Sequence, residues 1–306
     1  MVRSILWIIL DCMTILDVVG KTPLVPLFAD RAGAKIFGKA EFLNPSGSVK
    51  DRAAKAMIFD GIKTGKLTKN KTILDATSGN TGVALAMFGA VLGYRVTLCL
   101  PSNANKERKR VLKAYHAEII ATNPLESSDG ALLKARQLAV ENPNIYFYSD
   151  QYNNPENWKS HYNGTALEIW EQTEHNLTHF VAGMGTSGTF IGTSRRLKEL
   201  NPAIKTIPMQ PASPLHGLEG MRHTETTIKS GFYDTSLFDG QIDVTTEDAR
   251  AMTQQLAGKY GLFVGISSGA NVLAAVKLAE TLPPDAIVVT ILCDSGFRYL
   301  SDELWD

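Results

Sequence analysis

Lys50 stands where a turn rich in glycine and serine meets a stretch rich in alanine, in the run Asn44-Pro-Ser-Gly-Ser-Val-Lys50-Asp-Arg. Residues 53–58 favour a helix, so the lysine lies at a helix start, where its charge opposes the helix dipole. That position costs stability and helps to lower the pKa of the amine, as a Schiff-base lysine requires. Taken alone, such a lysine is more often a solvated surface charge; the apolar strand expected before the turn favours a chemical role.

A second polar run, Thr-Ser-Gly-Asn-Thr-Gly at residues 77–82, separates an expected strand at 73–76 from an expected helix at 81–92. A helix N-cap explains one polar residue but not four polar residues with two glycines. Such a run can direct several backbone N–H groups at a carboxylate, and the positive end of the helix dipole favours the negative charge. The run is therefore a candidate site for a substrate carboxylate.

A third run, Gly-Met-Gly-Thr-Ser-Gly-Thr at residues 183–189, matches the Gly-x-Gly-x-x-Gly pattern between a strand and a helix. A dinucleotide site also needs an acidic residue about 20 positions further on, at the end of the next strand. This chain has Pro208-Met-Gln210 there, which argues against a nicotinamide-dependent oxidoreductase. Hydroxyl residues between glycines instead favour a compact phosphate site at the helix start.

A fourth run, Gly-Ile-Ser-Ser-Gly at residues 265–269, has an ordinary helix N-cap as its simplest interpretation. It is out of register with the Gly-x-Ser-x-Gly pattern of a serine nucleophile. Residues 20–22 lack the earlier glycine of a P-loop, since Ile15 occupies that position. The six histidines show no metal-ligand spacing, so no metal site is expected.

The elements that must position these runs alternate between strand and helix along the chain, which predicts mostly parallel sheets covered on both faces. A length of 306 residues favours two lobes, which are expected to meet near residue 150.

Equal numbers of basic and acidic residues, 31 each, argue against a nucleic-acid or membrane partner. Three scattered cysteines indicate a reducing, cytoplasmic location. The apolar start is expected to be a buried strand, or Met13 the true start, rather than a signal peptide.

Together the four runs, in this order and at this spacing, resemble the cysteine synthase family of pyridoxal-phosphate enzymes, over residues 22–301. The run Cys-Asp-Ser-Gly-Phe-Arg-Tyr-Leu-Ser at 293–301 is most similar to the B-type O-acetylserine sulfhydrylases. The resemblance implies the two-lobed tryptophan-synthase-β-like fold (fold type II), each lobe a mostly parallel sheet flanked by helices. It also implies a smaller mobile lobe at 41–150, a larger cofactor-binding lobe at 1–40 and 151–306, and a homodimer.

Carried over motif by motif, the resemblance implies that Lys50 is catalytic and holds the cofactor covalently. Asn80 is expected to bond the ring hydroxyl, and Ser268 to face the pyridine nitrogen. The phosphate would lie on Gly185, Thr186, Ser187, Gly188 and Thr189. The substrate carboxylate would lie on Thr77, Ser78, Gly79, Thr81 and Gln151.

The implied reaction makes L-cysteine from O-acetylserine and sulfide or thiosulfate, through an aminoacrylate intermediate. Arg222 lies in a segment expected to close over the substrate, where it is either an anion-binding residue or a solvated surface charge. An anion there would be the phosphate of O-phosphoserine or the end of thiosulfate. O-phosphoserine sulfhydrylase and cystathionine β-synthase-like reactions therefore stay open, as does a non-catalytic, regulatory paralogue that binds the cofactor.

Overall fold

The structure is a computed structural model that describes residues 14–28, 32–77 and 79–305. Two sheets, parallel except for the pair β1–β2, organise these residues. The smaller sheet, in the order β5-β4-β3-β6, consists of β3 (Thr72–Ala76), β4 (Val96–Pro101), β5 (Glu118–Thr122) and β6 (Tyr146–Tyr148). The larger sheet, in the order β1-β2-β10-β7-β8-β9, consists of β1 (Leu24–Leu27), β2 (Lys35–Lys39), β7 (His179–Gly183), β8 (Lys205–Pro211), β9 (Ile242–Val244) and β10 (Ile287–Ile291). The α/β fold with mostly parallel sheets is thus confirmed.

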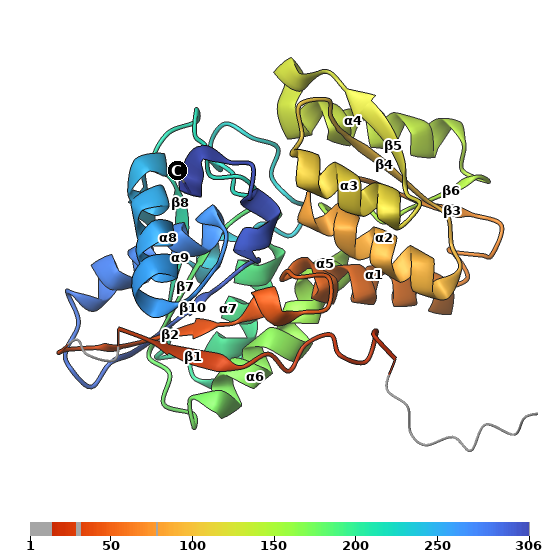
Figure 1. Cartoon of the computed structure of the whole chain (residues 1–306). Helices are drawn as coiled ribbons and strands as arrows, with labels where there is room; N and C mark the ends of the chain where they lie inside the picture. The colour runs from red at the N-terminus through yellow and green to blue at the C-terminus, as the bar shows by residue number, and fades with distance from the viewer. Residues whose placement is uncertain (1–13, 29–31, 78, 306) are drawn as a thin grey trace, which may run out of the picture.

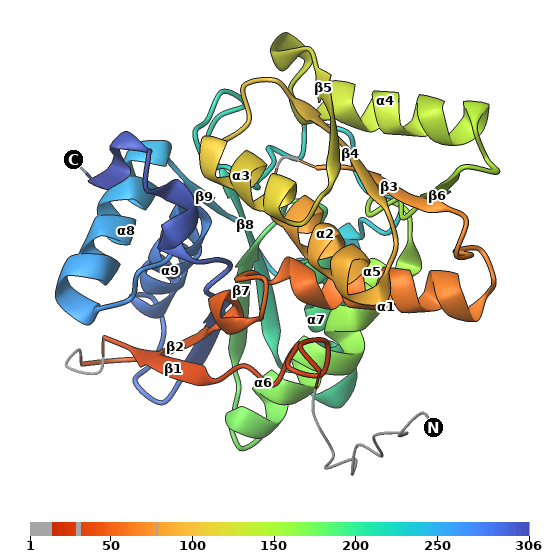
Figure 2. The same cartoon turned by 45° about the vertical axis from the view of Figure 1, so that its right-hand side comes forward.

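Helices cover both faces of each sheet (Figure 1). The smaller sheet packs against α2 (Asn80–Leu92), α3 (Lys106–Ala114) and α4 (Ser127–Glu141). The larger sheet packs against α6 (Ala166–Gln172) and α7 (Gly188–Leu200) on one face, and α8 (Thr246–Tyr260) and α9 (Ile266–Ala279) on the other. Between the two sheets, α1 (Lys50–Lys63) packs against α2 and α5 (Pro155–Ser160), and α5 packs against α7 (Figure 2).

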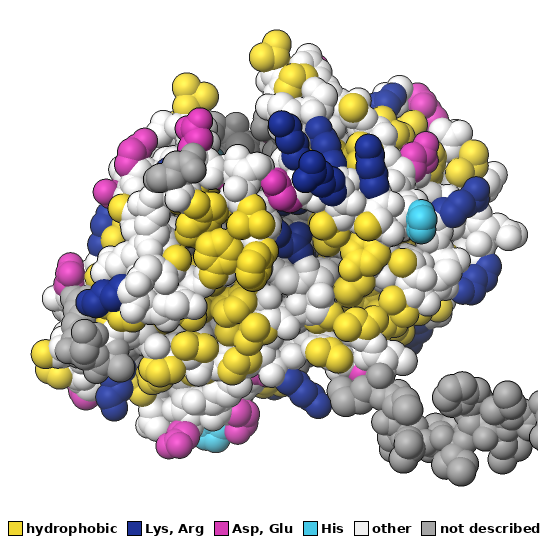
Figure 3. Space-filling view, in the orientation of Figure 1, with side chains coloured by type: hydrophobic (Ala, Val, Ile, Leu, Met, Phe, Trp, Pro, Cys, Tyr) yellow, Lys and Arg dark blue, Asp and Glu magenta, His cyan; other side chains and the backbone are white. Residues whose placement is uncertain are grey.

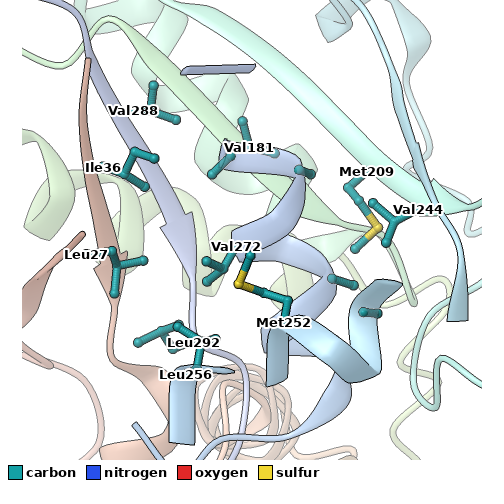
Figure 4. Close-up of a cluster of buried hydrophobic side chains, with 14 of the residues drawn as sticks. Leu27, Ile36, Val181, Met209, Val244, Met252, Leu256, Val272, Val288 and Leu292 are labelled. Carbon is teal, nitrogen blue, oxygen red and sulfur yellow. The ribbon is translucent and has the colours of Figure 1, made fainter. Parts of the chain in front are cut away.

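Apolar side chains from α8, α9 and the larger sheet form the core shown in Figure 4. Val272 of α9 lies among Met252 and Leu256 of α8 and Val181 and Val288 of the central strands, all of them buried. Removal of this apolar area from water is the main force that holds the helix pair on the sheet. Because α9 is fixed in this way, its N-terminus has a defined position at the edge of the sheet.

The α2 helix shows how small residues bring a helix close to a strand. A side chain at Gly89 would collide with Val96 of β4, and one at Gly82 would collide with Thr77 and Leu98. The helix ends at Gly93, which has a left-handed conformation (φ 72°) that glycine adopts without strain. The sequence predicts this helix and its end correctly.

Other boundaries differ from the sequence expectations. The sequence pattern predicts a strand over residues 35–43, but β2 ends at Lys39 and a short helical turn, Glu41–Leu43, follows. The pattern predicts a helix over residues 131–140, whereas α4 starts at Ser127 and ends at Glu141. The sequence patterns missed α5 and β9, which are only six and three residues long.

The strands of the smaller sheet all lie within residues 41–150, and those of the larger sheet lie outside that range. The division into a mobile smaller lobe and a larger lobe remains a prediction. The expected buried strand at the chain start, the question of Met13 and the expected role of Ser78 all lie outside the described residues. Within the described ranges, no helix is both long and apolar enough to cross a bilayer.

Candidate active site

A cavity lies at the ends of the central strands, between the two sheets. The floor of the cavity is formed by Ala182 and Gly183 of β7 and by Ile291 of β10. Four helix starts reach it, with Lys50 from α1, Asn80 from α2, Thr189 from α7 and Ser267 from α9. Helix starts concentrate unpaired backbone N–H groups and positive partial charge, so this cavity favours an anionic ligand.

Lys50 is the first residue of α1, and the turn before it is fixed to the strand end after β10. The Val49 N–H donates to the Cys293 carbonyl at 2.9 Å, and Ser48 forms a bridge with Asp294. Burial lowers the pKa of the Lys50 amine, although the neighbouring Cys293 and Asp294 act in the opposite direction. Among the described residues, no hydrogen bond or ion pair engages its Nζ. The side chain therefore brings a deprotonatable amine into the cavity.

The loop between β7 and α7 forms a cradle at the start of α7. Ser187 has a left-handed conformation (φ 64°), and no hydrogen bond in the described chain engages the backbone N–H groups of residues 186–190. A side chain at Gly185 would collide with the Gly220 carbonyl, so only glycine fits there. Unpaired N–H groups at a helix start are what a phosphate requires.

Hydroxyl groups of this loop are held by residues distant in sequence. The Asn157 amide donates to Thr186 Oγ1 at 3.1 Å, and the Ser187 and Ser230 hydroxyls lie 2.8 Å apart. Thr189 Oγ1 lies 3.3 Å from the His161 ring. Burial keeps the pKa of that histidine well below its usual range, so the ring is neutral. The predicted phosphate residues 185–189 are thus brought together in one fixed loop, of which Gly185 and Thr189 line the cavity.

The run at 77–82 is a second fixed loop, at the start of α2. Thr77 Oγ1 accepts hydrogen bonds from the N–H groups of Gly79 and Gly82, at 2.9 and 3.2 Å. The Thr81 hydroxyl donates to Gln151 Oε1 at 2.8 Å, and the Gln151 amide donates to the Ala76 carbonyl. The structure brings the described members of the predicted carboxylate site together, but within this unit only Asn80 lines the cavity.

A chain of polar contacts that the sequence did not reveal connects Asn80 and Arg108, on helices of the smaller sheet, to residues that follow β8 and β10. The Asn80 amide and the Tyr299 hydroxyl both donate to Asp294 Oδ2, at 2.6 and 2.7 Å. Arg108 of α3 donates to the Tyr299 hydroxyl at 2.8 Å and forms an ion pair with Glu219. These contacts span up to 214 positions of sequence, so no local pattern could have indicated them.

Two buried oxygens at this point have no hydrogen-bond partner within the described ranges. They are Asn80 Oδ1 and Asp294 Oδ1. An unsatisfied buried polar atom costs free energy and often marks a place for a ligand or water. Asn80 lines the cavity, so its free oxygen is available to a hydroxyl group of a bound molecule.

The two serines at the start of α9 differ in what they contact. Ser267 lines the cavity, whereas Ser268 Oγ is fully buried and accepts a hydrogen bond from the Cys293 N–H at 2.8 Å. Successive side chains of a helix point about 100° apart, so only one of the two can face a ligand. The structure therefore does not bring Ser268, the predicted partner of the pyridine nitrogen, to the cavity, and it places Ser267 there.

Arg222 is also not brought to the cavity. Its guanidinium forms an ion pair with Asp129 at 2.8 Å, donates to Ser128 Oγ at 2.8 Å, and lies over the Tyr152 ring. The side chain is buried, so it is not the solvated charge that the sequence left as the alternative. Its neighbours Glu219, Gly220 and Met221 line the cavity instead.

Comparison with known proteins assigns this site to a family. Residues 15–294 match the family described as pyridoxal-phosphate dependent enzyme. The chain belongs to that family.

Curated relatives of this pyridoxal-phosphate dependent enzyme include a cysteine synthase of Aquifex aeolicus, 48% identical over 95% of this chain and 92% of the relative. Cysteine synthase B of Escherichia coli is 41% identical over 94% of each chain. The solved structure of an O-acetylserine dependent cystathionine β-synthase from Helicobacter pylori superposes with a TM-score of 0.91. Its sequence is 36% identical, and the match covers 96% of this chain and 99% of the other. The resemblance identified from the four motifs is confirmed.

The residues of the cavity fit the cofactor that the family name states. An amine without a partner, a loop of unpaired N–H groups and a free amide oxygen lie around one space. These match, in turn, the aldehyde, the phosphate and the ring hydroxyl of pyridoxal phosphate.

Proposed function

We infer that this pyridoxal-phosphate dependent chain is a cysteine synthase, which makes L-cysteine from O-acetyl-L-serine and sulfide. The cysteine synthase relatives at 41–48% identity over nearly the whole chain support this activity. The observation that carries it is the buried Lys50 amine, which shares one cavity with the start of α7 and with Asn80. A lysine that is only a solvated surface charge would not need the start of α7 or Asn80 beside it.

In this proposal Lys50 holds the cofactor covalently and Asn80 Oδ1 accepts a hydrogen bond from the ring hydroxyl. Gly185, Thr186, Ser187, Gly188 and Thr189 bind the phosphate. The loop of Thr77, Ser78, Gly79 and Thr81, supported by Gln151, binds the substrate carboxylate. We assign the position facing the pyridine nitrogen to Ser267, because Ser267 lines the cavity whereas the Ser268 hydroxyl accepts a hydrogen bond from the Cys293 N–H.

Pyridoxal phosphate, when bound, supplies an electron sink that acidifies the substrate Cα–H and permits loss of the group on Cβ. The substrate amine would take the place of Lys50 on the cofactor and release Nζ, which would then take the Cα proton. The lowered pKa makes the neutral amine available as a base. The loop at 77–81 orients the carboxylate so that the Cα–H faces this amine. Acetate leaves Cβ, sulfide forms the new C–S bond there, and Lys50 returns the proton to Cα.

A serine at the ring nitrogen limits how far the negative charge is stabilised. The Ser267 hydroxyl carries no charge, so it leaves the nitrogen largely unprotonated, whereas an aspartate would favour the protonated form. A weaker electron sink disfavours a long-lived carbanion and favours elimination at Cβ. This preference is consistent with β-replacement chemistry.

A second candidate activity has support in the solved Helicobacter pylori structure, which is that of an O-acetylserine dependent cystathionine β-synthase. That enzyme accepts the same activated serine, so this chain would use a larger thiol, homocysteine, in place of sulfide.

We further propose that the chain is cytoplasmic, with Cys99 and Cys293 as free thiols, and that it works as a homodimer with a mobile smaller lobe.

The direct test supplies the purified holoprotein with O-acetylserine and either sulfide or homocysteine, and quantifies the product by mass spectrometry. Cysteine formation well above that of a Lys50→Ala variant is the expected result. Cystathionine as the main product would favour the second candidate. Absence of both products at parent levels of bound cofactor would refute a catalytic role and leave a binding protein.

A further inference from the structure

Glu219 is the acidic side chain in the lining of the cavity, which it reaches from the loop after β8. Its carboxylate forms an ion pair with Arg108, whose side chain is only 3% exposed. Among the described lining residues, Lys50 is the basic side chain. Since Lys50 is committed to the cofactor in the proposed function, Glu219 sets the charge that a second ligand meets.

The position of Arg108 explains what Glu219 prevents. A side chain at Gly79 would collide with the Arg108 guanidinium, so this cation lies directly behind the loop proposed to bind the substrate. Planar guanidinium groups are the preferred partners of phosphate and similar anions. The ion pair with Glu219 offsets the Arg108 charge on the side that faces the cavity.

No arginine of the described chain lines the cavity itself. Arg222 is engaged by Asp129, and Arg298 donates to the Ser46 carbonyl. Lys106, Arg110 and Lys113 lie on the outer face of α3, where Figure 3 shows a group of basic side chains. These surface cations attract every anion alike, so they do not discriminate between singly and doubly charged reactants.

We propose that Glu219 determines specificity by excluding doubly charged reactants, so that sulfide and O-acetylserine are used while thiosulfate and O-phosphoserine are not. This inference rests on the proposed function. A carboxylate in a partly desolvated cavity repels a dianion strongly, whereas sulfide is neutral or singly charged near pH 7. Its pairing with Arg108 also removes the cation that would otherwise receive the dianion.

The first experiment uses the parent holoenzyme with four combinations of donor and sulfur source. The kcat/KM for sulfide with O-acetylserine is expected to be at least about a hundredfold higher than the kcat/KM with thiosulfate or with O-phosphoserine. Electrostatic repulsion that lowers kcat/KM by two factors of ten would give this ratio. Comparable use of thiosulfate or O-phosphoserine would overturn the inference. Failure with sulfide and O-acetylserine as well would instead refute the proposed function.

The second experiment removes the negative charge of Glu219. Glu219→Gln is expected to raise the ratio of thiosulfate to sulfide kcat/KM by at least about tenfold, and calorimetry should show tighter thiosulfate binding to the holoenzyme. Glu225→Gln is the matched control, since it removes the same charge from an exposed position on the same segment. An unchanged ratio in Glu219→Gln, or an equal rise in Glu225→Gln, would overturn the inference. If Glu219→Gln does not fold, Glu219→Ala serves, with the same ratio as the readout.

Discussion

Lys39 is fully buried and Lys50 is partly buried, and the two lysines differ in their partners. Lys39 Nζ donates to the Thr22 carbonyl at 2.5 Å and to Gln172 at 2.8 Å, and it forms an ion pair with Glu168 at 2.7 Å. Lys50 Nζ has no such contact in the described chain. Burial lowers the pKa of both amines, but only for Lys39 does a hydrogen-bonded carboxylate oppose the shift. The contrast supports a structural role for the paired Lys39 and the reactive role that we propose for Lys50.

The paired region also fixes the position of the reactive one. Arg52, two residues after Lys50, binds Glu41 through Nε and Nη2 and Glu168 through Nη1 and Nη2, all at 2.7–2.8 Å. These contacts hold the first turn of α1 against the helical turn at Glu41–Leu43 and against α6. A bidentate pair gives geometric precision as well as energy. Because Glu168 also binds Lys39, the same group of ion pairs fixes the start of α1, where Lys50 lies.

The largest expected effect comes from Lys50→Ala. Turnover should fall by at least about a thousandfold, about 4 kcal/mol in activation free energy, because base and covalent anchor are lost together. The cofactor should become removable by dialysis, while thermal unfolding of the apoprotein stays close to that of the parent. Retention of the cofactor through dialysis, with measurable turnover, would contradict the assigned role of Lys50.

Lys39→Met is expected to have the opposite profile. Loss of one partner from a buried ion pair costs about 3–5 kcal/mol of unfolding free energy, and the lower end applies because Arg52 still binds Glu168. Denaturant unfolding measures this loss, with Lys35→Met at the exposed start of the same strand as the control. If the two variants unfold alike, the contrast between paired and unpaired lysines has no energetic basis.

Arg222→Ala tests another buried, paired cation. Its removal leaves Asp129 without this partner and exposes the Tyr152 ring, which should cost about 1–3 kcal/mol of stability. The kcat/KM with sulfide and the much lower kcat/KM with thiosulfate should change by the same factor, because the guanidinium does not line the cavity. A loss confined to thiosulfate would show that Arg222 binds the anion, as one interpretation of the sequence holds.

The smallest expected effects distinguish Ser267 from Ser268. Ser267→Ala should change the absorbance spectrum of the bound cofactor and lower turnover by about tenfold, since about 1.4 kcal/mol is typical of one hydrogen bond. Ser268→Ala should leave the spectrum unchanged and cost about 1 kcal/mol of stability, because the Cys293 N–H loses its acceptor. The reverse pattern would restore Ser268 as the residue at the ring nitrogen.

The fold could be predicted from sequence where elements are long and their patterns strong. The α2 helix and its glycine end, or the alternation of strands with helices, follow from local propensity and periodicity. The β9 strand and the α5 helix are too short to show a period, and tertiary packing decides them.

Part of the site could also be predicted from local patterns. Lys50 and the glycine-rich loops at 77–82 and 183–189 are local signals at strand-to-helix junctions. The Asp294–Asn80 bond and the Arg108–Glu219 pair join distant segments, and only the folded chain brings them together. The choice between Ser267 and Ser268 depends on a single residue of helical register, which a motif does not specify.

The central claim is that the unpaired lysine, and not the paired one, carries the cofactor. Borohydride reduction of the parent holoenzyme fixes the linkage, and peptide mass spectrometry then locates the modified lysine. The account predicts modification at Lys50 alone. Modification at Lys39, or at any other lysine with Lys50 unmodified, would contradict it.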